Sequence, residues 1–154
     1  MNKYSENFNQ SGYNKYVDWL RKMLDKQKIK PIYSTGRKSM AISEFEIKRI
    51  EKLVGNFVES RRPDPSIRNE VDISFKITGQ SFEIFEIRPR WDDPEIKFEI
   101  PVAKGTYIKS KKIWKLYWKK SDMKWHWYEP FGESESLEEV LKAIDQDQHC
   151  CFWG

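Results

Sequence analysis

The chain has little cysteine and no long apolar stretch. Its only two cysteines, Cys150 and Cys151, are neighbours, and adjacent cysteines rarely bridge each other. A disulfide framework is therefore excluded, and a reducing cytoplasm fits best. No run of eighteen apolar residues is present, and residues 1–12 lack the apolar stretch of a signal peptide. We expect a cytoplasmic protein that does not contact a membrane.

Motifs that bind metals or cofactors are also missing. His126, His149 and the two cysteines lack the Cys-x-x-Cys spacing with which paired ligands wrap a zinc ion. The chain has no phosphate-binding glycine loop and no nucleophile elbow. A nuclease-like site would need an acid beside a Glu-x-Lys pair, but Asp72 is predicted to face away from Glu86. We predict no metal site and no cofactor.

What the chain does have is lysine and aromatic rings, unevenly distributed. Residues 104–128 contain eight lysines and seven aromatic residues but a single acid, Asp122. Residues 1–40 carry nine basic side chains against three acids, and residues 129–154 carry seven acids against Lys142. The formal net charge of +4 conceals this segregation. Such a field can steer an anionic ligand to one side, or it can dock the acidic tail on the basic segment.

The periodicity of the apolar residues predicts an α+β fold in one domain over residues 39–154, preceded by an N-terminal helical appendage and basic linker over residues 1–38. Two capping-box spacings, Ser43 with Glu46 and Ser136 with Glu139, predict helices over residues 44–59 and 137–145. Between them, alternation predicts a roughly five-stranded antiparallel meander sheet, with both helices on one face. The predicted strands cover residues 70–78, 81–88, 100–109, 112–120 and 123–128. The appendage is predicted to hold a helix over residues 13–26.

The lysine-rich strands are predicted to present one face to the core and one to solvent. If the turn near residues 121–122 pairs Trp118 with Trp125, then His126 lies opposite Tyr117, which itself lies opposite Lys104. A histidine beside a lysine could do acid/base work near neutral pH, or it could be an ordinary half-exposed side chain. The candidate binding residues on this face are Lys104, Lys115, Tyr117, Lys119, Lys124, His126 and Tyr128.

A carboxylate interrupts the apolar stripe of the first predicted hairpin. Alternation places Glu86 on the same side as Ile73 and Ile84. An unpaired buried carboxylate is very costly, so we expect Glu86 to be mostly buried and paired with Arg88 or Arg90. This polar core candidate is either a structural ion pair or part of a catalytic cleft.

Five ordered motifs resemble those of a bacterial family known only as a domain of unknown function. They are FEIRPRW at residues 85–91, PVAK at residues 101–104, WKLYW at residues 114–118, KWHWYEP at residues 124–130 and CFWG at residues 151–154. The usual ending of that family is similar to CFFG, so Trp153 is an aromatic departure. The resemblance covers residues 40–154. It implies that the fold extends to the last residue, and it carries no activity and no assigned catalytic residue.

Three kinds of function fit these observations. The leading hypothesis is a small binding module whose lysine-aromatic face engages single-stranded or structured nucleic acid without chemistry of its own. The alternative is an enzyme with a cleft around Glu86, Arg88, Lys104 and His126. A third hypothesis is a protein-interaction subunit that meets an acidic protein partner. Exposed tryptophans would favour the first hypothesis, because tryptophans in a core cannot stack on bases.

Overall fold

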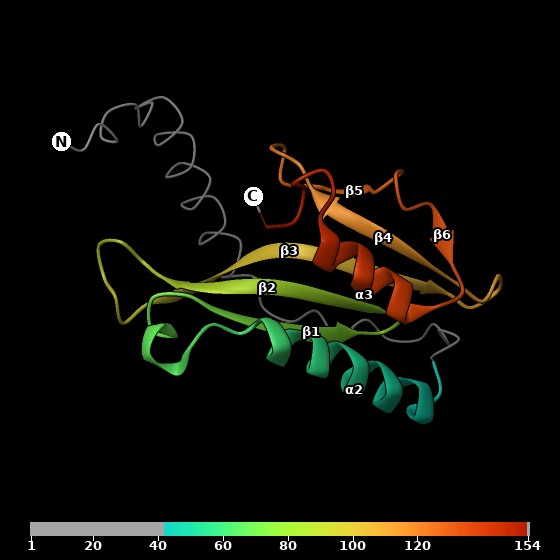
Figure 1. The fold of residues 1–154 in the computed structure, drawn as a ribbon, viewed down its shortest axis with the longest axis horizontal. Helices are drawn as coiled ribbons and strands as arrows, with labels where there is room; N and C mark the ends of the chain where they lie inside the picture. Colours follow the sequence, from blue (N-terminus) through green and yellow to red (C-terminus); the bar gives the residue numbers. More distant parts are fainter. Residues whose placement is uncertain (1–41, 154) are drawn as a thin grey trace, which may run out of the picture. The chain divides into compact units, whose positions relative to one another are not determined.

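The computed structural model describes residues 42–153. The helix predicted over residues 13–26 and the boundary predicted near residue 38 lie outside the described residues. The described part is an α+β domain of two α-helices, one short 3₁₀ helix and six strands (Figure 1). In chain order the elements are α2 (Glu44–Arg61), η1 (Pro65–Ile67), β1 (Asp72–Thr78), β2 (Ser81–Pro89), β3 (Lys97–Ile108), β4 (Ile113–Lys119), β5 (Trp125–Trp127), β6 (Glu133–Ser134) and α3 (Leu137–Gln146).

The sheet is an antiparallel meander, as the alternating pattern predicts. Its strands follow the order β1-β2-β3-β4-β5, and the two residues of β6 pair with the far end of β4. The predicted register between β3 and β4 is correct, because Gly105 lies opposite Leu116 and Tyr107 lies opposite Trp114. A Cβ atom on Gly105 would lie 2.2 Å from the ring of Phe82, so only glycine allows this ring to pack here.

Both helices begin where the two capping-box spacings predict, although only the first spacing forms the full reciprocal capping box. The backbone N–H of Glu46 donates to Ser43 Oγ at 3.2 Å, and the Ser43 N–H donates to Glu46 Oε2 at 3.0 Å. The N–H of Glu139 likewise donates to Ser136 Oγ at 3.3 Å. Helix α2 ends at Arg61, two residues before Pro63, because a proline disfavours helical geometry in the residue ahead of it.

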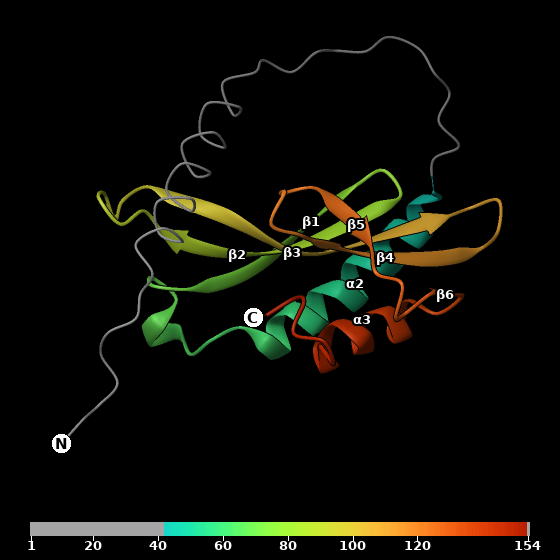
Figure 2. The same cartoon turned by 90° about the horizontal axis from the view of Figure 1, so that it is seen from above.

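Helices α2 and α3 lie on the same face of the sheet (Figure 2). The core forms between them and the sheet, and its fully buried members come from both layers. They include Val54 of α2, Ile84 of β2, Leu116 of β4 and Ile144 of α3. Burial of such side chains is the main favourable term in folding, at about 1.5–3 kcal/mol each. Among the described elements, no helix covers the opposite face of the sheet.

The end of the chain folds back onto the core. Asp147, in the left-handed conformation that ends α3, accepts hydrogen bonds from the backbone N–H groups of Cys151, Phe152 and Trp153 at 2.7–3.2 Å. Phe152 is buried, and the indole of Trp153 donates to the Ile144 carbonyl at 2.9 Å. The fold therefore continues at least to Trp153, the last residue that the structure describes.

Candidate nucleic-acid interface

The side chains that alternate with the core residues form one polar and aromatic face of the sheet, which we call the open face. Residues directly opposite each other on paired strands point to the same side, so the strand registers define its members. Lys104 on β3 lies opposite Glu83 on β2 and Tyr117 on β4, and Tyr117 lies opposite Trp127 on β5. Its members include Lys76, Glu83, Lys104, Thr106, Lys115, Tyr117, Lys119, Trp125, Trp127 and Glu133.

The predicted pairing of β5 is wrong by one residue. Trp118 lies opposite His126 rather than Trp125, and Tyr117 lies opposite Trp127 rather than His126. The turn between β4 and β5 includes Met123, whose φ of 63° is in the left-handed region. This conformation accompanies the one-residue change in the register of β5 against β4. Because side chains alternate with a period of two, this shift moves every β5 side chain to the other face.

His126 and Tyr128 therefore lie away from the open face, contrary to the predicted placement. His126 Nε2 lies 2.8 Å from Asp122 Oδ2, beneath the same turn. Hydrogen bonds from the Lys124 N–H and from His126 lower the pKa of Asp122. Tyr128 is buried, packs edge-on against the Phe152 ring at 5.0 Å, and has a pKa raised by that burial. Lys124 lies in the turn itself, where it is exposed.

Trp125 and Trp127, which the predicted register assigned to the core, lie on the open face instead of His126 and Tyr128. Trp127 is 43% exposed, and its indole N–H donates to the Gly132 carbonyl at 3.3 Å, which fixes the ring at the sheet edge. Trp125 lies opposite Lys119 and is partly exposed. Trp114, by contrast, is 5% exposed and belongs to the core. These two exposed rings are the main functional candidates that the sequence pattern missed.

Lysines of the open face lie over these rings. Lys115 Nζ is 5.2 Å from the centroid of the Trp127 ring, and Lys119 Nζ is 5.0 Å from that of Trp125. Lys104 Nζ lies 5.8 Å from the centroid of the same Trp125 ring. Ammonium groups within about 6 Å of a ring centroid are attracted by its electron-rich face, at about 0.5–1 kcal/mol when exposed. Each of the two rings thus has at least one ammonium group over it.

Carboxylates compensate part of this positive charge. Glu83 contacts both Lys104 at 3.3 Å and Lys76 at 3.6 Å, while Lys115 pairs with Glu133 at 3.0 Å. Burial lowers the pKa of Lys119, against the opposing effect of Glu83. A polyanion that binds here must therefore exchange these carboxylates for its own phosphates.

The acidic C-terminal segment does not dock on the lysines as a whole, because α3 lies on the other side of the sheet. Glu138 of α3 pairs with Arg49 of α2 at 3.2 Å, and Asp145 forms an ion pair with Arg61. Of this segment, Glu133 alone is paired with a lysine of the open face among the described residues. Within the part of the chain that the structure describes, the acidic segment therefore leaves most of the open face uncovered.

The polar core candidate is only partly buried. Glu86 pairs with Arg88 at 2.8 Å, which confirms the predicted contact, but its side chain is 18% exposed and that of Arg88 is 47% exposed. Arg90 pairs with Asp92 instead. Glu86 shares the helix-side face with Ile73, whereas Lys104 is on the open face. The four residues of the proposed catalytic cleft therefore do not come together.

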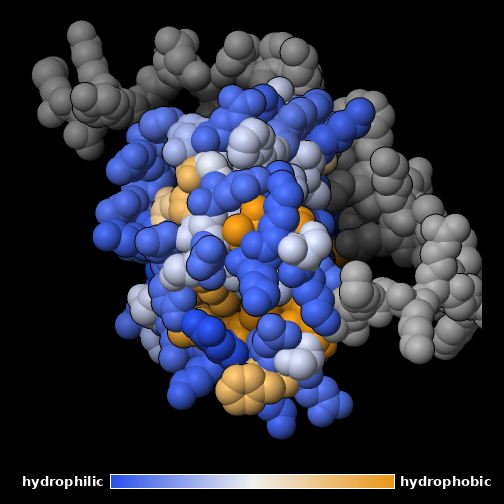
Figure 3. Space-filling model, turned by 90° about the vertical axis from the view of Figure 1, so that its right-hand side faces the viewer, coloured by the Kyte–Doolittle hydropathy of each residue, from blue (hydrophilic) through white to orange (hydrophobic). Residues whose placement is uncertain are grey.

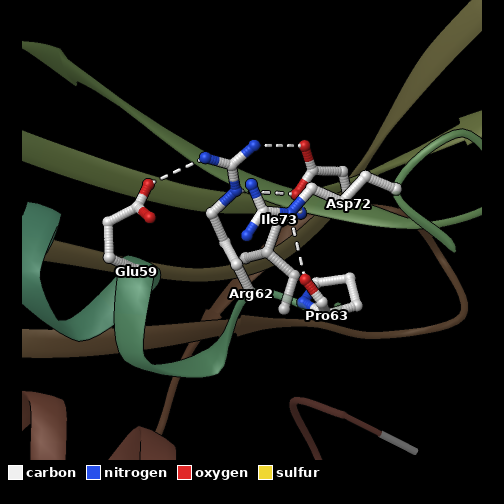
Figure 4. A network of polar contacts seen from close by, with 6 residues as sticks. Glu59, Arg62, Pro63, Asp72 and Ile73 are labelled. Carbon is white, nitrogen blue, oxygen red and sulfur yellow. Dashed lines mark hydrogen bonds and ion pairs between the residues drawn. The ribbon is translucent and has the colours of Figure 1, made fainter. Parts of the chain in front are cut away.

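A second polar network joins the end of α2 to the start of β1 (Figure 4). Arg62 donates to both oxygens of Asp72, from Nε at 2.9 Å and from Nη2 at 2.7 Å, and also contacts Glu59 at 2.8 Å. This bidentate pairing lowers the pKa of Asp72 and raises that of Arg62. The Asp72 carboxylate is thus paired with the Arg62 guanidinium.

The described residues contain no group of three or more His, Cys, Asp or Glu side chains that could hold a metal ion.

A small hollow opens at the end of the domain that holds the start of α2 and the β3–β4 turn. Figure 3 views this end and shows hydrophobic surface recessed between hydrophilic side chains. The hollow has a volume of about 100 Å³ and is lined by apolar residues that include Ile42, Ile50, Trp114 and Leu137. Pockets for drug-sized ligands measure about 300–1,000 Å³, so this space is too small for such a ligand.

Fold and surface together define a small α+β domain with a lysine-tryptophan sheet face. Residues 42–154 match the family model described as Domain of unknown function (DUF3024), and the chain belongs to this family. A comparison with curated proteins and a comparison with solved structures each gave no match. No helix among the described residues is long and apolar enough to cross a membrane.

Proposed function

We propose that the open face binds single-stranded nucleic acid without catalysing a reaction. The observation that carries the proposal is the placement of Lys115 over Trp127 and of Lys119 over Trp125, with Tyr117 between the two lysines on β4. Aromatic rings on a sheet stack on unpaired bases, while neighbouring lysines hold the phosphates. Lys104 extends the cationic row toward β2.

A single strand fits this face better than a duplex does. The rings stand on a sheet surface rather than on a helix that could enter a major groove. Stacking requires the flat side of a base, and that side is covered in a duplex. The ion pairs of Lys104 and Lys115 with Glu83 and Glu133 also favour moderate, salt-sensitive affinity, since each phosphate displaces a carboxylate.

The two cysteines support a cytoplasmic location for the protein. Cys150 and Cys151 are both free thiols, and the former is exposed. Free exposed thiols persist in a reducing compartment, so a cytoplasmic nucleic acid is the ligand we propose.

Fluorescence anisotropy with a labelled oligonucleotide of about ten nucleotides tests the proposal, because that length spans a typical single-strand site. The logarithm of the association constant should fall linearly with the logarithm of salt concentration, with a slope of about −0.7 per phosphate contacted. Replacing Lys115 and Lys119 together by Gln should make the slope shallower by about 1.4. Trp127→Ala should cost about 1–3 kcal/mol of binding free energy, the value of one stacked base.

Matched controls lie on the helix side of the domain. Lys48 and Lys52 are exposed on α2, and Phe45 is 79% exposed on the same helix. Replacing these lysines by Gln, or Phe45 by Ala, should leave affinity and slope unchanged. Absence of binding at low salt, or equal effects of open-face and control variants, would refute the proposal. Binding of an acidic protein at the lysines would then become the better explanation.

A further inference from the structure

One acid stands among the eight lysines of residues 104–128. Asp122 lies in the turn between β4 and β5, next to the end of the open face where Lys119 pairs with Trp125. A negative charge at this place repels a ligand that carries phosphates. The binding of a single strand by lysines and rings gives this acid no task, but its hydrogen bonds connect it to one of the rings.

The carboxylate of Asp122 holds the residues on both sides of Trp125. Its Oδ1 accepts a hydrogen bond from the backbone N–H of Lys124 at 3.0 Å, and its Oδ2 lies 2.8 Å from Nε2 of His126. Lys124 and His126 come directly before and directly after Trp125 in the chain. The two carboxylate oxygens therefore restrain both neighbours of this ring.

The turn itself has a conformation that its sequence does not favour. The Met123 N–H donates to the Lys120 carbonyl at 2.9 Å, and the Lys120 N–H donates to the Lys124 carbonyl at 3.4 Å, which closes a three-residue loop over residues 121–123. The last residue of such a loop is left-handed and is usually glycine. Here it is Met123, with φ of 63°. The Asp122 carboxylate, which bonds to the backbone two residues on, stabilises this turn in place of a glycine.

Trp127, the other ring of the open face, is held by different contacts. Its indole N–H donates to the Gly132 carbonyl at 3.3 Å, and the residue after it, Tyr128, is buried in the core. Asp122 contributes to neither contact. The indole N–H of Trp125 has no hydrogen bond within the described residues, so the place of this ring depends on the pairing of β5 with β4 and on the contacts of Asp122.

We propose that Asp122 is a positioning residue for nucleic-acid binding, because it holds Trp125 in the place on the open face where a base stacks on the ring. The inference rests on the proposed single-strand function. It predicts the opposite of what net charge predicts. Removing the negative charge of Asp122 weakens binding, since the loss of a well-placed stacking surface outweighs the gain in attraction for phosphates.

Fluorescence anisotropy with the labelled oligonucleotide compares wild type with two variants of Asp122. Asp122→Ala should bind about 5-fold or more weakly, the loss expected when one base no longer stacks. Asp122→Asn also removes the charge but keeps an acceptor for the Lys124 N–H, so it should recover most of the affinity. Glu129→Gln is the control, because it removes one charge from an exposed side chain two residues beyond Trp127. Its affinity should equal or exceed that of wild type.

A double-mutant cycle shows whether Asp122 acts through Trp125. In a Trp125→Ala background, the further change Asp122→Ala should have little effect on affinity, whereas in a Trp127→Ala background it should weaken binding by the full factor. Equal weakening in both backgrounds would overturn the positioning role. The same conclusion would follow if Asp122→Ala bound as tightly as wild type or more tightly.

The NMR signals of the indole N–H groups test the restraint in the absence of a ligand. In Asp122→Ala the Trp125 signal should move or broaden, while the signals of Trp127 and of the buried Trp114 stay in place and show that the domain is folded. An unmoved Trp125 signal, or equal movement of all three, would contradict the proposal. Failure of every strand to bind wild type would refute the proposed function, and with it the binding role of Asp122.

Discussion

Single residues on the open face combine two kinds of contact. Lys115 is shared between the Trp127 ring and the Glu133 carboxylate, and Lys104 is shared between Trp125 and Glu83. Because each ammonium already has an acid and a ring, the face is held in order before a ligand arrives. A base that stacks on either ring takes the place of the ammonium above it, and the displaced lysine can then pair with the adjoining phosphate.

At the same scale, the Arg62–Asp72 pair should make stability depend on acid pH. The pKa of Asp72 is lowered in the folded state relative to about 3.9 in the unfolded chain. Its stabilising contribution is therefore present above about pH 4 and is lost as pH falls through the lower folded pKa. Asp72→Asn should reduce stability at neutral pH by about 1.5–3 kcal/mol, the value of a hydrogen bond to a charged group.

Urea unfolding at a series of pH values measures this effect. Asp72→Asn should also flatten the decline of stability below pH 4 relative to wild type. Glu59→Gln is the control, because Glu59 contacts the same arginine but is 63% exposed. Surface pairs are worth about 0–1 kcal/mol, and an equal loss in both variants would show that Asp72 has no special role.

At the scale of secondary structure, local rules predicted the elements and the meander. The two capping-box spacings identify where α2 and α3 begin, because each N-cap serine accepts a hydrogen bond from the backbone N–H three residues later. Strict alternation in β1 and in the β3–β4 hairpin identifies the core side, because a half-buried strand must alternate. These features depend on residues close together in the chain.

The features that the sequence did not reveal depend on turn geometry. The left-handed Met123 shifts β5 by one residue, which exchanges His126 for Trp127 on the open face. The register shift between Ile84 and Phe85 against β3, and the short pairing of β6 with β4, have no pattern of their own either. A non-glycine residue at positive φ is uncommon, so the sequence favoured the simpler turn and the wrong face for β5.

The C-terminal tail gives an element-scale prediction. Asp147→Ala removes the acceptor for the N–H groups of Cys151, Phe152 and Trp153. We expect a loss of at least about 1.5–3 kcal/mol in unfolding free energy, the value of one hydrogen bond to a charged group. Amide exchange at residues 150–153 should increase in the same variant, because the tail then loses its bonds to the carboxylate and keeps mainly side-chain packing and the Trp153 indole bond.

Asp145→Ala, two residues earlier on α3, is the matched control. Asp145 is 53% exposed and pairs with Arg61 at the surface, so its loss should cost less than about 1 kcal/mol. Similar stability and similar tail protection in both variants would mean that packing of Phe152, rather than Asp147, holds the tail.

For the described domain as a whole, one face of the sheet forms the core with the helices, and the other carries the lysines and aromatic rings. The helices cover one face and contribute to the core, and their acids pair with arginines of α2 rather than with the lysine row (Figure 2). The other face carries lysines, rings and a few acids, with no described helix on it. This division explains the segregated charge of the sequence, since the acidic C-terminal segment folds away from most of the basic strands.

The most direct test of the open face as a nucleic-acid interface is the NMR spectrum of the tryptophan indole N–H groups. Trp125 and Trp127 lie on the open face, whereas Trp114 is buried and the Trp153 indole is bonded to the Ile144 carbonyl. Titration with a single-stranded oligonucleotide at low salt should shift the signals of Trp125 and Trp127, leave those of Trp114 and Trp153 in place, and reverse when salt is raised. Unchanged signals for Trp125 and Trp127, or shifts confined to Trp114 and Trp153, would contradict the assignment of function to this face.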